Sequence, residues 1–123
     1  MLDWPRGFFM PQAFTIVIKS DSKIAPAHAY HLCKELIGMQ QSINCVFLLG
    51  PSLDILRQDQ ALQPDEVDLL KLWQQFATQN KLNIVACKGS LATRAIIAPS
   101  WVTPGSVAIL FTHIDTNTKM VYL

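Results

Sequence analysis

The chain has 123 residues, of which half are apolar and 15% are charged, and its formal net charge is +1. This composition argues against a disordered protein, and the length suits one domain with its own hydrophobic core. The sequence has no run of basic residues and no apolar stretch of roughly 18 residues, so we expect neither direct nucleic-acid binding through a basic patch nor a membrane helix.

Residues 1–12 are expected to form an N-terminal extension, and residues 13–123 a single α/β domain. The extension lacks the basic start, the continuous apolar stretch and the cleavage site of a secretory signal. Three cysteines without such a signal fit free thiols in a reducing cytoplasm. Their spacing matches no zinc motif, so we expect no metal site.

Apolar runs alternate with segments of helical periodicity along the rest of the chain. Strands are expected at 13–19, 43–49, 82–87, 106–111 and 118–123. Helices are expected at 25–38, 64–79 and 90–97, with one helical turn near Leu53–Leu56. Residues 98–105 contain many turn formers and are expected to be a loop, with Trp101 as an exposed interface anchor. Alternating strands and helices predict right-handed βαβ crossovers and a mainly parallel five-stranded sheet covered on both faces.

Cys87 stands where the third expected strand gives way to a short helix, and it is the candidate catalytic residue. In open parallel sheets, ligand chemistry gathers at the carboxyl ends of strands. The free N–H groups of the following turn, including that of Gly89, together with Lys88 and Arg94, favour the nucleophilic thiolate. His113, after the fourth expected strand, is a candidate proton donor. Position alone leaves open that Cys87 is an inert buried residue.

The remaining candidates are better explained as ordinary structural residues. Cys33 lies on the apolar stripe of a helix and Cys45 lies inside a strand, so both are expected in the core. His28 and His31 share a helix at a spacing that suits a metal ion, but no acidic or cysteine third ligand is near in sequence.

The segment Asp65–Gln75, the apolar strand after it, and Cys87 with Arg94 seven residues later resemble the DsrE/TusD family of sulfur-relay proteins. The resemblance is best over residues 43–96, and it implies a flavodoxin-like three-layer α/β sandwich. It implies that Cys87 is the active cysteine of a cytoplasmic, TusD-like sulfurtransferase subunit that needs no metal or organic cofactor. That subunit would relay persulfide sulfur from a donor to an acceptor carrier protein, within a heterohexamer of TusB- and TusC-like subunits, toward 2-thiouridine in tRNA.

Two segments depart from the family pattern. Residues 20–26 lack the glycine that is usual after the first strand, and residues 112–117 stand where a longer loop and a further helix are usual. Three alternatives therefore stay open: a non-catalytic interaction subunit, a homo-oligomeric binding domain in which Cys87 is inert, and a DsrE-type carrier for sulfur oxidation.

Overall fold

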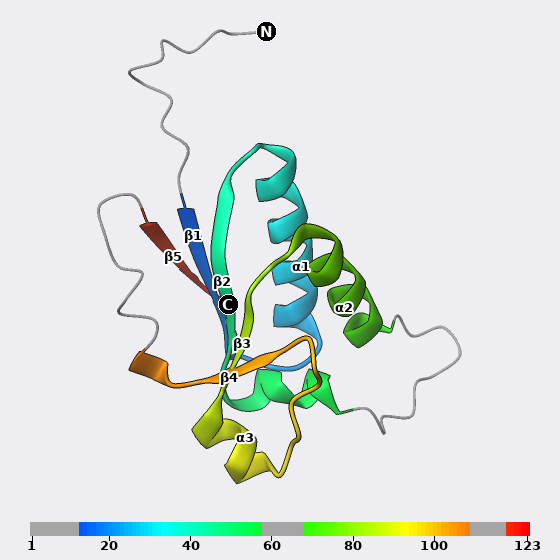
Figure 1. The fold of residues 1–123 in the computed structure, drawn as a ribbon, viewed down its shortest axis with the longest axis vertical. Helices are drawn as coiled ribbons and strands as arrows, with labels where there is room; N and C mark the ends of the chain where they lie inside the picture. The colour runs from blue at the N-terminus through cyan, green and yellow to red at the C-terminus, as the bar shows by residue number, and fades with distance from the viewer. Residues whose placement is uncertain (1–12, 58–67, 109–117) are drawn as a thin grey trace, which may run out of the picture.

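The computed structural model describes residues 13–57, 68–108 and 118–123 (Figure 1). Its elements in chain order are β1 (Ala13–Ile18), α1 (Ile24–Gly38), β2 (Ser42–Leu48), the 3-10 helix η1 (Gly50–Leu56), α2 (Leu69–Asn80), β3 (Ile84–Cys87), α3 (Lys88–Arg94), β4 (Thr103–Gly105) and β5 (Thr118–Tyr122). The strands form one five-stranded sheet in the order β4-β3-β2-β1-β5, and every neighbouring pair is parallel. The predicted α/β class with a mainly parallel five-stranded sheet is confirmed. In the described ranges, no helix combines the length and apolar character that crossing a membrane requires.

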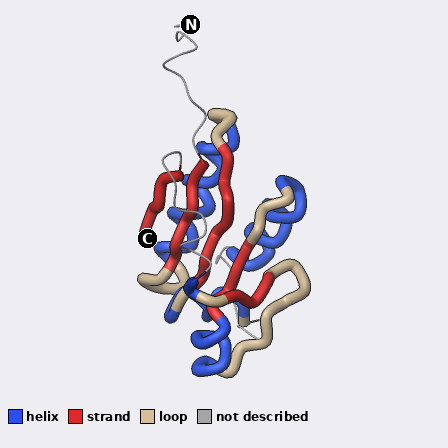
Figure 2. The backbone as a smooth tube through the Cα atoms, turned by 60° about the vertical axis from the view of Figure 1, so that its left-hand side comes forward, coloured by secondary structure: helices blue, strands red, loops and turns tan. Residues whose placement is uncertain are grey.

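Successive side chains of the strands point to opposite faces of the sheet, and both faces are buried. On one face, alternate strand residues pack against α1, η1 and α2; these strand residues are Ile16, Ile18, Val46, Leu48, Ile84 and Ala86. Figures 1 and 2 show that α1 and α2 cover this face side by side. A second cluster on the strands holds Val17, Cys45, Phe47, Val85 and Cys87. Cys87 therefore belongs to the face opposite α1 and α2.

Local side-chain contacts fix where the two long helices begin. The Asp21 carboxylate accepts hydrogen bonds from the N–H groups of Lys23 at 2.7 Å and Ala25 at 3.1 Å, and also from that of Ile24, at the start of α1. The Asp68 carboxylate caps α2 in the same way, by accepting a 3.1 Å bond from the Lys71 N–H. Each carboxylate satisfies backbone donors that the first turn of a helix leaves unpaired.

Aromatic side chains join α1 to α2. The Trp73 indole donates a 3.1 Å hydrogen bond to the Pro26 carbonyl, and its ring lies edge-on to Tyr30 with centroids 5.7 Å apart. Phe76 also packs edge-on against Tyr30, at 5.4 Å. These contacts bury the apolar stripe of α2, as its periodicity predicts.

The fourth strand is predicted at 106–111, of which residues 109–111 lie outside the described residues. The strand that pairs with β3 is Thr103–Gly105, inside the predicted loop, and residues 106–108 are not strand. Pro104 is tolerated because β4 is an edge strand. A Cβ atom on Gly105 would lie 2.6 Å from Val85 Cγ1, so only glycine allows this close pairing. The residues that read as turn formers are thus the ones that let β4 approach β3.

Two other expectations change, one in its boundaries and one in its exposure. The helix predicted at 90–97 begins directly after β3, at Lys88, and it ends where Ala95 adopts a left-handed φ of 53°. Trp101 is half-buried and packs against the core, so it is not the exposed anchor that we expected. The N-terminal extension and the first residues of the predicted helix 64–79 lie outside the described residues.

Candidate functional site

Cys87 is the last residue of β3 and the N-cap of α3, with φ −62° and ψ 121°. Its side chain is 8% exposed and packs within the second-face cluster. The register of the sheet pairs it with Gly105 on β4. The thiol thus lies at the carboxyl edge of the sheet, as the sequence predicts, on an interior strand between β2 and β4.

The environment of the Cys87 thiol favours its anionic form. Burial by itself raises the pKa of Cys87, but the N–H and hydroxyl of Ser90 and the N–H of Gly89 more than offset it, so that the pKa lies below its ordinary value. The sulfur makes no side-chain capping hydrogen bond to α3. A Cβ on Gly89 would lie 3.9 Å from Sγ, which places the sulfur against this turn.

The other two cysteines have the opposite character. Burial raises the pKa of Cys33 to about 12. Burial also raises the pKa of Cys45, with the Thr15 hydroxyl on the neighbouring strand partly opposing it. Both side chains are fully buried, which confirms the prediction that they belong to the core. A thiol held in its neutral form is a poor nucleophile, so Cys87 is the one cysteine of the chain suited to thiolate chemistry.

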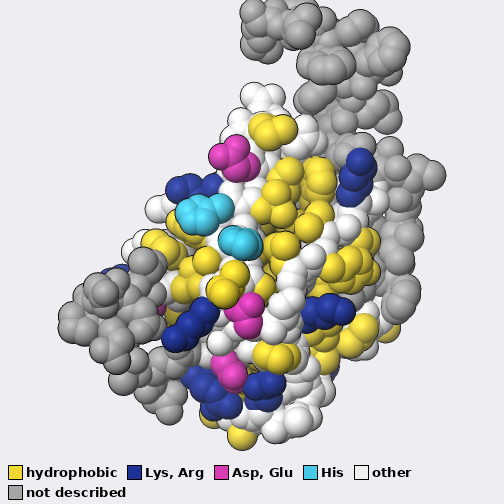
Figure 3. Space-filling model, turned by 180° about the vertical axis from the view of Figure 1, so that it is seen from behind, with side chains coloured by type: hydrophobic (Ala, Val, Ile, Leu, Met, Phe, Trp, Pro, Cys, Tyr) yellow, Lys and Arg dark blue, Asp and Glu magenta, His cyan; other side chains and the backbone are white. Residues whose placement is uncertain are grey.

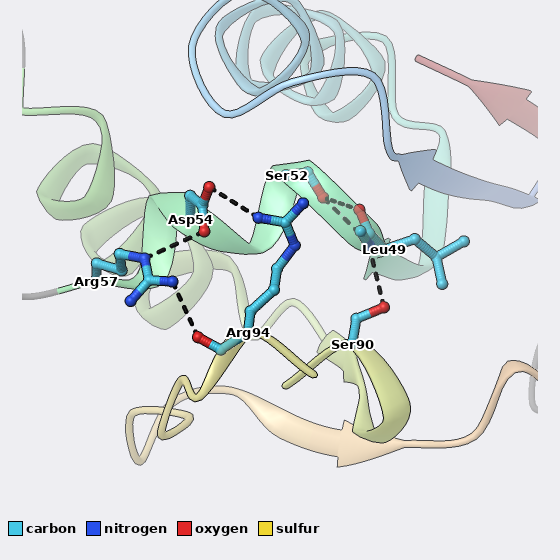
Figure 4. A network of polar contacts seen from close by, with 7 residues as sticks. Leu49, Ser52, Asp54, Arg57, Ser90 and Arg94 are labelled. Carbon is cyan, nitrogen blue, oxygen red and sulfur yellow. Dashed lines mark hydrogen bonds and ion pairs between the residues drawn. The ribbon is translucent and has the colours of Figure 1, made fainter. Parts of the chain in front are cut away.

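Two further residues predicted to stabilise the thiolate, Arg94 and Lys88, lie within the described residues. The Arg94 guanidinium pairs with Asp54 on η1, with Nη1 3.0 Å from Oδ2, and Arg57 pairs with the same carboxylate at 3.1 Å (Figure 4). Arg57 also donates a 2.9 Å hydrogen bond to the Arg94 carbonyl. Lys88 is exposed. Neither Arg94 nor Lys88 is among the groups that lower the pKa of Cys87, and His113 lies outside the described residues.

Ser90 is the site residue that the sequence reasoning missed. It follows the N-cap by three positions, and its N–H and hydroxyl are among the groups that lower the pKa of Cys87. Its Oγ accepts a 3.1 Å hydrogen bond from the Gly50 N–H, which links α3 to the start of η1 (Figure 4). The spacing from Cys87 was readable in the sequence, but the contact with Gly50 spans 40 residues and was not.

Residues 12–118 match the DsrE/DsrF-like family. The chain belongs to this family. The DsrE/DsrF-like family is associated with sulfur transfer, so the resemblance that the sequence suggested is confirmed at the level of the family. No curated protein matches the sequence significantly.

The solved structure of the ychN protein from E. coli has the same fold. It superposes with a TM-score of 0.73 over 93% of this chain and 100% of that chain, at 12% sequence identity. At this identity the similarity concerns the fold alone. It supports the flavodoxin-like arrangement of the DsrE/DsrF-like domain described above.

The chemistry open to this DsrE/DsrF-like site is that of a thiol. Among the residues that the structure describes, no group of three His, Cys, Asp or Glu side chains lies close enough to hold a metal ion. His28 and His31 are exposed on α1. A hollow of about 390 Å³ opens at the carboxyl end of α3, lined by Arg57 and by apolar residues that include Ile96 and Ile97. The described polar groups around Cys87 are donors that stabilise negative charge on sulfur.

Proposed function

We propose that this chain is a sulfurtransferase subunit that carries sulfur as a persulfide on Cys87. The observation that supports this most is the contrast among the three thiols: the pKa of Cys87 is lowered, whereas burial raises the pKa of both Cys33 and Cys45. A low-pKa thiol at the carboxyl edge of a parallel sheet is where a nucleophile is expected. Membership of the DsrE/DsrF-like family agrees with sulfur as the transferred group.

The reaction consists of two thiol exchanges. The Cys87 thiolate attacks the outer sulfur of a donor persulfide, the donor S–S bond breaks, and the donor leaves as a thiolate while Cys87 becomes a persulfide. An acceptor thiolate then attacks the outer sulfur of the Cys87 persulfide, and Cys87 leaves as a thiolate. No net oxidation or reduction takes place, so the transfer requires no redox cofactor.

The biological context that we propose is TusD-like. The segment Asp65–Gln75 and the spacing of Cys87 and Arg94 resemble that branch, whose complex with TusB- and TusC-like subunits relays sulfur toward 2-thiouridine in tRNA. Assembly with further subunits is supported by apolar side chains that stay exposed, among them Ile97 at 90% and Ile24 at 66%. On the face that Figure 3 shows, apolar side chains gather in patches among charges of both signs.

A second candidate is a non-catalytic interaction subunit of the same fold. The observation that favours it is the low exposure of Cys87, at 8%, which limits access by a donor. A sulfur-oxidation carrier would use the same two exchanges as the first proposal, and it differs only in its donor and acceptor. Persulfide uptake therefore separates the interaction subunit from both carriers.

The test is intact-mass spectrometry after incubation with a cysteine desulfurase, L-cysteine and sulfur-carrier proteins. We expect a gain of about 32 Da, the mass of one sulfur atom, that a thiol reductant reverses. The variant C33A/C45A, in which Cys87 is the only thiol, should gain the same mass, and Cys87→Ser should gain none. A folded C33A/C45A variant that stays unmodified beside a persulfidated carrier would contradict the proposal and favour the interaction subunit.

A further inference from the structure

We propose that Gly89 keeps open the side of the Cys87 sulfur from which the donor and the acceptor of sulfur approach. This inference rests on the proposed function and assigns a residue that controls access to its nucleophile. It starts from a contrast between two neighbouring residues: Cys87 is 8% exposed, whereas Gly89, in the first turn of α3, is exposed.

The fold itself does not require a glycine at position 89. Gly50 has a left-handed φ of 52°, and a Cβ on Gly105 would lie 2.6 Å from Val85 Cγ1, so each of these glycines has a structural reason. Gly89 has neither reason, because its φ lies outside the left-handed region and the position of its Cβ is free of close contacts. Within a helix, glycine is also less stable than alanine. The absence of a side chain at position 89 therefore points to a role at the thiol.

A side chain on Gly89 would lie directly beside the sulfur. Among the described residues other than the chain neighbours and the backbone of α3, Sγ of Cys87 is the one heavy atom within 4 Å of that Cβ, at 3.9 Å. This is an ordinary van der Waals distance. Reacting atoms have to come within about 3–3.5 Å of each other before a bond forms. A methyl group on residue 89 would thus occupy part of the space that an incoming sulfur atom needs.

The sheet closes other sides of the sulfur. Cys87 packs in the second-face cluster with Val85 and Phe47, which are fully buried, and it pairs with Gly105 on β4. A packed interior contains few voids larger than a water molecule, so a partner's sulfur cannot reach the thiol from there. Within the described part of the chain, the exposed turn at Gly89 therefore offers the route from the surface to Sγ.

Both half-reactions use this space. In the first, the outer sulfur of the donor approaches Sγ beside Gly89, the new S–S bond forms as the donor S–S bond breaks, and the donor leaves as a thiolate. The transferred sulfur, about 2.05 Å from Sγ, then lies in the same open space. In the second, an acceptor thiolate attacks this sulfur from the surface, and Cys87 leaves as a thiolate. A side chain at position 89 should therefore slow both exchanges.

The experiment measures the rate of Cys87 alkylation against pH in the C33A/C45A background. It uses two neutral reagents that share the same reacting carbon and differ in size, iodoacetamide and its N-phenyl derivative. At high pH, where the thiol is fully ionised, Gly89→Ala should slow the reaction with iodoacetamide roughly fivefold to a hundredfold, the range that an overpacked contact implies. The N-phenyl reagent should be slowed more than iodoacetamide, and Gly89→Val should react more slowly than Gly89→Ala with both.

Gly38→Ala is the matched control. Gly38 is likewise a helical glycine outside the left-handed region, and a Cβ there would meet no described atom within 4 Å. Both alanine variants should fold at least as stably as the parent, because alanine is the better helix former. Gly38→Ala should leave the alkylation rates with both reagents unchanged.

Equal high-pH rates for the parent and for a folded Gly89→Ala or Gly89→Val variant would overturn the inference. A slower reaction that arises only from a shifted midpoint of the pH profile would also overturn it, because the added side chain would then act on ionisation and not on access. Neither reagent requires a sulfur donor, so the two proposals can fail separately. Rates that depend on the size of residue 89, in a chain that accepts no sulfur, contradict only the proposed function. Sulfur uptake with rates that ignore residue 89 contradicts only this inference.

Discussion

Gly105→Ala tests how closely β4 is held beside the candidate site. The added Cβ would lie 2.6 Å from Val85 Cγ1, whereas carbon atoms in contact are ordinarily about 3.5–4.0 Å apart. The two strands would have to separate by roughly 1 Å at the point where Gly105 pairs with Cys87. Because Val85 is fully buried, we expect this overpacking to lower the free energy of unfolding by about 1–3 kcal/mol.

A double-mutant cycle with Val85→Ala isolates this contact. Val85→Ala removes the colliding methyl. By itself it should lower the free energy of unfolding by about 1.5–3 kcal/mol, because buried apolar surface is lost. In that background Gly105→Ala should cost little, so the two substitutions should be non-additive by about 1–3 kcal/mol. Urea unfolding measures each free energy, and the alkylation rate of Cys87 reports whether the edge beside it has opened. Additive costs would refute the argument, because they would mean that the Gly105 position does not depend on Val85.

Two further substitutions test the start of α1 and the place of Arg94. The N–H groups of Lys23, Ala25 and Ile24 hold the pKa of Asp21 below its ordinary value of 3.8. The Asp21 carboxylate therefore stabilises the fold above that pH. In urea unfolding, the stability of the wild type relative to Asp21→Ala should decrease as the pH falls below 3.8. Arg94→Gln should cost at most about 1 kcal/mol, less at high salt, because the Arg94–Asp54 pair is about a third exposed. It should leave the pH profile of Cys87 alkylation unchanged, and a shifted profile would mean that the guanidinium acts on the sulfur after all.

The elements that the sequence predicts well are those whose own residues carry a clear pattern of strand or helix. β1 and β2 are mainly apolar runs followed by polar or glycine residues, and their observed bounds differ from the predicted ones by one residue at most. α1 has an apolar stripe of helical period and ends at Gly38, as predicted. Cys87 could be placed at the carboxyl edge of the sheet for the same reason, since β3 is apolar throughout and ends at the thiol.

The features that could not be predicted depend on residues far apart in the chain. β4 owes its position to the space that Gly105 leaves beside Val85, and a Thr-Pro-Gly sequence by itself reads as a turn. Arg94 forms an ion pair with Asp54, 40 residues away in the sequence. Its closeness to Cys87 in the sequence therefore suggested the wrong partner for its charge. Ser90 accepts a hydrogen bond from the Gly50 N–H, which only the fold brings near.

The pH dependence of stability tests the contrast among the thiols without any sulfur donor. The pKa of Cys87 is lowered in the fold, so its thiolate contributes stability above its ordinary value of 9.0, and this stability is lost as the pH falls through the folded value. The pKa of Cys33 is raised to about 12, so its contribution is complete below its ordinary value of 9.0 and is lost as the pH rises toward 12. In urea unfolding with a reductant, the stability of the wild type relative to Cys87→Ser should therefore increase from pH 7 to pH 9 and then level off. Its stability relative to Cys33→Ser should stay level up to pH 9 and then decrease. All other titrating groups are common to the three proteins and cancel in both differences. A constant difference between wild type and Cys87→Ser across this range would mean that the fold does not favour the Cys87 thiolate, and the main support for the proposed nucleophile would be lost.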